Sequence, residues 1–371
     1  MSKGLEDVVA SSSAITYIDG IHGRLLYRGF DIKDLVQHSN YEEVAYLLLH
    51  EHLPRPEEMK SFSAGLNSKR ALPDGIRSIL DSLPRDGDAM DALEMAVASL
   101  GIYDDPSLPL NDKAVSIASK IATAVAYIHR HRQGLRYLDP RADLGQSSNL
   151  LYMITGEEPD ELSEGLLDTV LIIHADHELN ASTFTARVVA STLSDAYSSV
   201  TAAVAALKGP LHGGANERVV EMVTEIGAPA NVESHVRAKL AKKEKIMGFG
   251  HRVYKTMDPR AEILRKCAES IASTPEEVNE LAILEKVQEF MLKEKGLYPN
   301  VDFYSGFVLH HVGIPTELFT PVFAVARTPG WLAHIIEQYS DNRIMRPIAH
   351  YTGPSYERYV PLSLRAGKIT N

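Results

Sequence analysis

Four short segments of this sequence contain histidine or aspartate residues in settings that could present a side chain to a substrate. The first is Gly248-Phe249-Gly250-His251-Arg252, which continues through Lys255 to Asp258-Pro259-Arg260. Two glycines before a histidine favour a tight loop that exposes the imidazole and leaves backbone amides free. A dinucleotide fingerprint would need a third glycine and a preceding strand. A surface loop with scattered charge explains this segment equally well.

The second segment, Lys208-Gly209-Pro210-Leu211-His212-Gly213-Gly214, precedes a helical pattern of apolar residues from Val219 to Ile226. We therefore expect His212 in a loop at a helix N-terminus, where the helix dipole disfavours a charged imidazolium. A neutral imidazole there can donate a hydrogen bond to a carbonyl group. The alternative is a capping loop whose glycines serve only the turn.

The third segment is His174-Ala175-Asp176-His177-Glu178-Leu179-Asn180, in which the two histidines are spaced by one helical turn. This spacing also suits metal binding. A metal site needs a third ligand, and neither a cysteine nor a zincin motif supplies one. For one histidine of the pair, a buried position with structural hydrogen bonds is the more frequent outcome. We expect no metal site.

The fourth segment, Pro299-Asn300-Val301-Asp302-Phe303-Tyr304-Ser305-Gly306, surrounds Asp302 with apolar and aromatic residues. Such surroundings raise the pKa of a carboxylate towards the range useful for proton abstraction. The alternative is a helix N-cap, a common role for aspartate. Two late arginines, Arg327 after an apolar run and Arg346 before Pro347, could pair with carboxylates in bidentate geometry. Taken singly, either arginine is more often part of a structural ion pair.

Length and composition indicate an ordinary globular protein of two domains. The 371 residues exceed the roughly 250–300 over which one core usually grows. No apolar run approaches the roughly 20 residues that span a bilayer, and residues 1–10 lack the apolar core of a signal peptide. The single cysteine, Cys267, excludes an intramolecular disulfide. We therefore expect a cytoplasmic protein.

The net charge of −11 disfavours nucleic acid and anionic membranes as partners. It also repels anionic metabolites. A site for an anionic substrate must therefore concentrate basic residues locally, as the arginines and histidines of these motifs would do.

Helical patterns dominate the chain, so we predict an all-α protein. Thr274-Pro275-Glu276-Glu277 combines an N-cap, a proline at the first helical position and a capping-box glutamate, and Gly296 would end that helix. Thr328-Pro329 predicts another helix start by the same logic. Alternation typical of strands is confined to 15–26, with Asp19-Gly20 as a possible hairpin turn. Residues 181–207 are rich in small side chains, which permit close helix packing.

Each motif alone is weak, but in this order they closely resemble the citrate synthase family over nearly the whole chain. The stretches from Ile18-Asp19-Gly20 to Phe30-Asp31 and from Arg346-Pro347 to Gly353 match as well. The resemblance is closest to the short dimeric form of Gram-positive bacteria and archaea. It implies a citrate synthase that condenses acetyl-CoA with oxaloacetate and hydrolyses the thioester, as in the tricarboxylic acid cycle.

By this resemblance, three residues are catalytic. Asp302 removes a proton from the acetyl methyl group, His212 hydrogen-bonds the thioester oxygen, and His251 polarises and protonates the ketone of oxaloacetate. His177 and His251 contact oxaloacetate, while Arg260, Arg327 and Arg346 bind its carboxylates.

The resemblance also implies a CoA site and an assembly. Main-chain groups of Ile246, Met247, Gly248, Phe249 and Gly250 would contact the adenine, and Lys255 a CoA phosphate. No cofactor is expected. A large helical domain, 1–213 with 323–371, would face a small helical domain, 214–322, across the active-site cleft. The enzyme would be a homodimer in which Arg346 reaches the partner's site, since the N-terminal extension of hexameric, NADH-inhibited members is missing.

Three alternatives remain at this point. A 2-methylcitrate synthase would use propionyl-CoA with the same catalytic residues, and one methyl group is worth only about 1–3 kcal/mol of discrimination. A non-catalytic helical scaffold would be expected to lack Asp302, His212 or His251, and all three are present. A metal hydrolase would have to be built on His174, His177 and Glu178.

Overall fold

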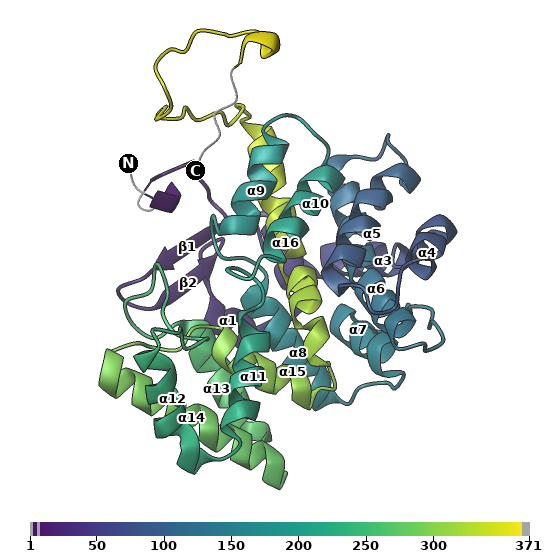
Figure 1. The fold of residues 1–371 in the computed structure, drawn as a ribbon. Helices are drawn as coiled ribbons and strands as arrows, with labels where there is room; N and C mark the ends of the chain where they lie inside the picture. Colours follow the sequence, from purple (N-terminus) through teal and green to yellow (C-terminus); the bar gives the residue numbers. More distant parts are fainter. Residues whose placement is uncertain (1–2, 6–7, 366–371) are drawn as a thin grey trace.

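The structure is a computed structural model that describes residues 3–5 and 8–365, and α-helices make up most of it (Figure 1). The α-helices are α1 (Ile32–His38), α2 (Tyr41–His50), α3 (Pro56–Ser68), α4 (Asp74–Asp81), α5 (Ala89–Tyr103), α6 (Leu110–Arg132), α7 (Gln146–Thr155), α8 (Glu161–His174), α9 (Ala181–Ala190), α10 (Ala196–Leu207), α11 (Ala215–Ile226), α12 (Val232–Ala241), α13 (Pro259–Ile271), α14 (Pro275–Lys295), α15 (Asp302–His311) and α16 (Phe319–Ser340). Short 3-10 turns are η1 (Lys3–Leu5), η2 (Pro229–Asn231), η3 (Thr316–Leu318) and η4 (Leu362–Leu364). The all-α prediction is confirmed.

The strands of the described residues form one small antiparallel sheet, which packs against α1. Its strands are β1 (Thr16–Asp19), β2 (Arg24–Tyr27) and β3 (Phe30–Asp31), in the order β1-β2-β3. Asp19 pairs with Arg24, so the hairpin loop is the four residues 20–23 rather than a two-residue Asp-Gly turn. The Asp19 carboxylate shapes this loop by accepting hydrogen bonds from the amides of Ile21 and His22.

Helix α16 forms the centre of the larger part of the molecule. It packs against α2, α6, α8, α9 and α10, and Figure 1 shows α9 and α10 beside it. All of its residues from Phe319 to Ile335 are buried. The small-residue segment 181–207 forms α9 and α10, which pack on each other and on this helix. A helix so enclosed can hold polar side chains in fixed positions within the core.

The prediction that Thr328-Pro329 starts a helix is wrong, because both residues lie inside α16. Proline has no backbone N–H and cannot bond the carbonyl four residues earlier, which here belongs to Val325. The hydroxyl of Tyr41 donates to that carbonyl at 2.7 Å and to the Ala326 carbonyl at 3.3 Å. A side chain from a distant helix thus satisfies the acceptor that the proline leaves open.

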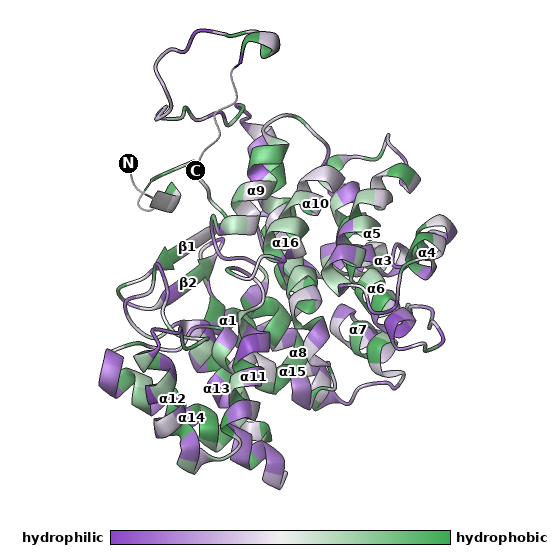
Figure 2. Cartoon of the chain, in the orientation of Figure 1, coloured by the Kyte–Doolittle hydropathy of each residue, from purple (hydrophilic) through white to green (hydrophobic). Residues whose placement is uncertain are grey.

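Helices α11 to α15 form the second part of the molecule, at the lower left of Figure 1. Helix α12 packs on α14, α11 packs on α14 and α15, and α13 packs on α15. Helix α14 begins with the predicted capping box at Thr274 and ends at Gly296 in the left-handed conformation. Figure 2 shows hydrophilic and hydrophobic residues mixed along these outer helices. Both α13 and α15 also contact α8, and the division into two domains stays a prediction.

The C-terminal segment 342–365 extends away from the helices as an arm (Figure 1). Its root is tied to the end of α9, where Ser191 bonds Asn342 and the backbone amide of Met345. Along this arm, seven large apolar or aromatic side chains are at least 62% exposed: Ile344, Ile348, Tyr351, Tyr356, Tyr359, Leu362 and Leu364. Such an apolar surface is typical of a segment that packs on another surface.

No helix among the described residues is both long enough and apolar enough to cross a membrane.

Candidate active site

The glycine-rich loop that carries His251 is paired with the segment that carries Asp302. The Asn300 amide donates to the Gly248 carbonyl at 2.9 Å, and its side chain donates to the Gly250 carbonyl at 3.1 Å. The Gly250 amide donates to the Tyr298 carbonyl at 3.2 Å. Gly248 has a φ of +80°, and a Cβ there would lie 2.7 Å from the Phe303 ring, so only glycine fits. These contacts bring two distant motifs to one place.

Backbone hydrogen bonds fix the tautomer of His251. Its Nδ1 accepts from the amide of Val253 at 3.0 Å and from that of Tyr254 at 3.2 Å. An accepting Nδ1 leaves the ring proton on Nε2, which is then free to donate. Burial, followed by the charge of the nearby Arg260, lowers the pKa of His251 to about 4. His251 is therefore a neutral hydrogen-bond donor near neutral pH.

His212 is fixed in the opposite tautomer. It precedes α11 in the predicted glycine-flanked loop, and its Nε2 accepts from the Ser182 amide at 3.2 Å, near the N-terminus of α9. The Ser182 hydroxyl also lies 2.8 Å from Nε2. The ring proton is therefore on Nδ1. Burial, followed by the charge of Arg327, lowers the pKa of His212 to about 4, so this ring too is a neutral donor.

The segment 174–180 does not form the helical pair of histidines that a metal site would use. Helix α8 ends at His174, and His177 lies in the loop beyond it. His174 is a buried structural residue, since its Nδ1 bonds the Val170 carbonyl and its ring packs on Phe323. Among the described residues, no group of three or more His, Cys, Asp and Glu side chains could hold a metal ion.

His177 lies beside His251 with a centroid separation of 5.1 Å, and its Nε2 is buried without a hydrogen-bond partner among the described residues. Burial, followed by the charges of Arg260 and His251, lowers the pKa of His177 well below its usual value. A buried polar atom without a partner is costly unless a ligand satisfies it. His177 is therefore a candidate ligand contact.

Asp302 is the first residue of α15, but it is not the N-cap. The N-cap is Val301, and the side-chain oxygen of the preceding Asn300 accepts from the Asp302 amide at 3.1 Å. The Asp302 carboxylate is left with one buried oxygen, Oδ1, that has no partner among the described residues. Burial raises the pKa of Asp302 to about 6 against the opposing charges of Arg260 and Arg327. A carboxylate with this pKa is suited to general base catalysis.

Arg260 and Arg327 are both buried, at 3% and 1% exposure, but their surroundings differ. Arg260 forms a two-point ion pair with Asp258, the N-cap of α13, at 3.0 and 2.7 Å. Arg327 projects from α16, donates from Nε to the His174 carbonyl at 2.5 Å and stacks on Phe323 at 4.9 Å. It forms no ion pair within the described residues. Burial lowers the pKa of Arg327 to about 10.

Arg327 is the point at which the motifs meet. Its charge acts on the pKa of Asp302, of His212 and of His177, which come from three different segments. The rings of His212 and His174 both pack near Phe323, the residue on which the Arg327 guanidinium stacks. The structure thus gathers three of the four predicted segments around one buried cation.

Arg346 and Lys255 lie outside this buried cluster. Arg346 is an exposed residue of the C-terminal arm. Lys255 is exposed as well, and its side chain donates to the Arg252 carbonyl at 3.2 Å. Of the predicted CoA contacts, Ile246 and Gly248 are buried, while Met247, Phe249 and Gly250 are partly exposed.

The sequence analysis missed two residues that prepare the site. Ser182 fixes the tautomer of His212, and its hydroxyl also accepts from the indole of Trp331 at 3.1 Å. Asn300 joins the two loops and leaves the Asp302 carboxylate uncommitted. Ser182 lies near the start of the helix that Asn180 caps, where backbone amides have no partner within the helix. The sequence therefore did indicate that its amide could bond another group. Nothing in the sequence alone indicated the role of Asn300.

A raised carboxylate pKa, two neutral donors and a buried cation are the means by which an enzyme forms an enolate beside a carbonyl and binds an anionic partner. Comparison with known proteins narrows this class of enzymes to one family. A family model described as "Citrate synthase, C-terminal domain" matches residues 4–348. The chain belongs to the citrate synthase family.

Individual relatives match this chain over nearly their full lengths. "Citrate synthase 2" of Bacillus subtilis is 46% identical over 98% of this chain and 99% of its own. "Citrate/2-methylcitrate synthase" of the same organism is 40% identical over 96% and 97%. The structure of the Thermoplasma acidophilum citrate synthase, solved as a ternary complex with carboxymethyl coenzyme A and oxaloacetate, has a TM-score of 0.94 at 36% identity over 98% of this chain and 99% of that chain.

Proposed function

We propose that this enzyme condenses acetyl-CoA with oxaloacetate through the buried cluster described above. The acetyl methyl group loses a proton to Asp302, and its carbon attacks the ketone carbon of oxaloacetate. The ketone oxygen takes a proton from His251, and this ring regains a proton from water while Asp302 gives up the proton that it took. Water then cleaves the citryl thioester, releasing citrate and CoA. The observation that carries this proposal is the Asp302 carboxylate, whose Oδ1 is buried without a partner among the described residues and whose pKa is raised to about 6.

His212 and His251 take different parts in this reaction because their protonated nitrogens differ. His212 presents Nδ1–H, which we assign to the thioester oxygen, where negative charge develops as the methyl proton leaves. His251 presents Nε2–H, which we assign to the ketone oxygen. A preorganised donor at a developing oxyanion is worth about 3–4 kcal/mol in comparable sites. Neutral rings suit this role, since neither has to lose a charge first.

Oxaloacetate is a dianion, and the proposal places it against Arg327, Arg260 and the unpartnered Nε2 of His177. Arg327 is the freer of the two buried cations, because Arg260 is already neutralised by Asp258. A third cation would therefore complete the site. Arg346 lies on the exposed arm, and we propose that it reaches the site of a second copy in a homodimer.

The CoA moiety is proposed to lie along residues Ile246, Met247, Gly248, Phe249 and Gly250, with Lys255 meeting a phosphate. The exposure of Lys255 supports that part of the proposal. Closure of 214–322 over 1–213 and 323–371 would exclude water from the enolate. The reaction as proposed needs no metal or other cofactor. A cytoplasmic location stays a prediction.

A second candidate substrate is propionyl-CoA, because one relative carries the name "Citrate/2-methylcitrate synthase". Both acyl groups would use the same base and donors. We propose acetyl-CoA as the better substrate by kcat/KM.

The test is steady-state kinetics with each acyl-CoA and oxaloacetate, with the product identified by mass spectrometry. We expect citrate, a higher kcat/KM for acetyl-CoA than for propionyl-CoA, and at least a thousandfold loss of kcat in Asp302→Asn. Preference for propionyl-CoA would contradict the proposed substrate. An Asp302→Asn enzyme with near-normal kcat would contradict the proposed base.

A further inference from the structure

A buried chain of hydrogen bonds lies behind the site, and the proposed mechanism does not use it. On α16, His334 is fully buried, and its Nε2 lies 3.3 Å from Asp176 Oδ2. Its Nδ1 lies 3.1 Å from Arg187 Nη1, which also bonds Glu337 at 2.6 Å. A guanidinium can only donate, so Nδ1 accepts and the ring proton on Nε2 faces Asp176.

Asp176, in the loop after α8, lies against α16 between the positions of Arg327 and His334. Gly330, midway between them, has no side chain, and a Cβ there would overlap the Ala175 carbonyl and the Asp176 carboxylate. The loop after α8 is therefore pressed directly against the helix. Asp176 immediately precedes His177, so any movement of Asp176 also moves a proposed substrate contact.

The two oxygens of Asp176 are used unequally. Oδ2 accepts from the hydroxyl of Thr16 at 2.5 Å and the amide of Glu178 at 3.2 Å, in addition to His334. Oδ1 is buried and has no partner among the described residues. Burial alone would raise the pKa of Asp176, but His334 and Arg327 hold it below the usual value. Asp176 is thus an ionised carboxylate close to Arg327 that forms no ion pair with it.

We infer that His334, oriented by Arg187, is a positioning residue that tethers Asp176 through Oδ2 and so keeps the Arg327 guanidinium free for the carboxylate of the substrate. The inference rests on the proposed function, because it needs Arg327 to bind oxaloacetate. Without the tether, Asp176 would turn towards Arg327. The two would then form a buried ion pair that competes with oxaloacetate but not with acetyl-CoA.

Two substitutions of His334 separate its two contacts. In His334→Gln the side-chain nitrogen stands near the position of Nε2 and can still donate to Asp176. In His334→Asn the shorter amide stands near Nδ1, so the Arg187 contact can be kept while the Asp176 contact is lost. Both variants are polar, and Glu337 remains an acceptor for Arg187 in each of them. A difference between them therefore reports on the tether to Asp176.

The expected result is a KM for oxaloacetate raised about tenfold in His334→Asn, equivalent to about 1.4 kcal/mol. The KM for acetyl-CoA should stay within threefold of wild type, as should every constant of His334→Gln. Adding Asp176→Asn to His334→Asn removes the competing charge and should return the oxaloacetate KM to within threefold of wild type. A general loss of structure would not be repaired in this way.

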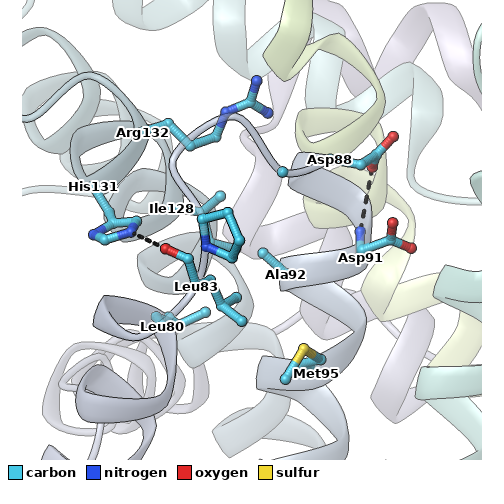
Figure 3. A pocket seen from close by; sticks show the side chains of 11 residues that line it. Leu80, Leu83, Asp88, Asp91, Ala92, Met95, Ile128, His131 and Arg132 are labelled. Atoms are coloured by element: carbon cyan, nitrogen blue, oxygen red, sulfur yellow. Dashed lines mark hydrogen bonds between the residues drawn. The ribbon is translucent and has the colours of Figure 1, made fainter.

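A direct binding measurement supports the kinetics. Trp331 is the only tryptophan and donates to Ser182 beside His212, so its fluorescence can follow an oxaloacetate titration without acetyl-CoA. The matched control is His131→Asn, which removes a hydrogen bond from Nε2 to the Leu83 carbonyl beside a cavity of about 140 Å³ elsewhere in the fold (Figure 3). We expect its oxaloacetate affinity to be unchanged.

The inference fails if His334→Asn binds oxaloacetate like wild type, if His334→Gln is equally impaired, or if Asp176→Asn does not repair His334→Asn. These outcomes are separable from failure of the proposed function. If the proposed function failed, the wild-type enzyme itself would form no citrate. If only the inference failed, the wild-type enzyme would be active and the variants would not differ as described.

Discussion

The pKa of Asp302 leads to a pH dependence that can be measured. Burial raises this pKa to about 6, and the charges of Arg260 and Arg327 oppose the rise. The proposed base must be ionised to take a proton. We therefore expect kcat/KM for acetyl-CoA, at saturating oxaloacetate, to fall as the pH is lowered through about 6.

The size of this pH effect on the rate follows from the shift in the pKa of Asp302. A rise from 3.8 to about 6 corresponds to about 3 kcal/mol of disfavoured charge. With a pKa of about 6, the ionised fraction is about a tenth at pH 5 and nearly complete at pH 8, so the rate should change roughly tenfold. Bound oxaloacetate adds negative charge, which moves the midpoint upward. The pKa values of His212 and His251, both about 4, predict no further change between pH 5 and pH 8.

The assay should follow loss of the thioester absorbance, because a thiol reagent has its own pH dependence. Asp168 provides a matched control. Burial raises its pKa to about 6 as well, but it bonds Ser147 and the Tyr41 amide rather than residues of the proposed site. Asp168→Asn should keep the acidic limb of the profile. A wild-type profile flat from pH 5 to pH 8, or a limb abolished by Asp168→Asn, would refute the reasoning.

Two further predictions concern assembly and stability. Arg346→Gln and Asp302→Asn should each be nearly inactive alone. Random mixing of the two variants should restore about a quarter of wild-type activity, because half of the dimers would contain one intact shared site. No recovery of activity would place Arg346 in the site of its own subunit. Tyr41→Phe should lower the free energy of unfolding in urea by about 1–3 kcal/mol, since the Val325 carbonyl opposite Pro329 loses its donor. The exposed Tyr17→Phe is its control, and equal midpoints for the two variants would count against this explanation.

Local signals in the sequence determined much of this protein. Helical spacing predicted the all-α fold, and Thr274 with Gly296 marked both ends of α14, because capping depends on residues within one turn. The glycines beside His251 and His212 likewise predicted loops that present an imidazole. The resemblance of the ordered motifs identified the family, which the comparisons confirmed.

Only the tertiary structure decided how these pieces work together. Pro329 lies within α16 because Tyr41, 284 residues before Val325, supplies the missing donor. The tautomer of His212 depends on the backbone amide of Ser182, 30 residues earlier, and the pKa of Asp302 depends on burial. The tether from His334 to Asp176 spans 158 residues. Such contacts arise when helices pack, and a pattern confined to neighbouring residues carries no record of them.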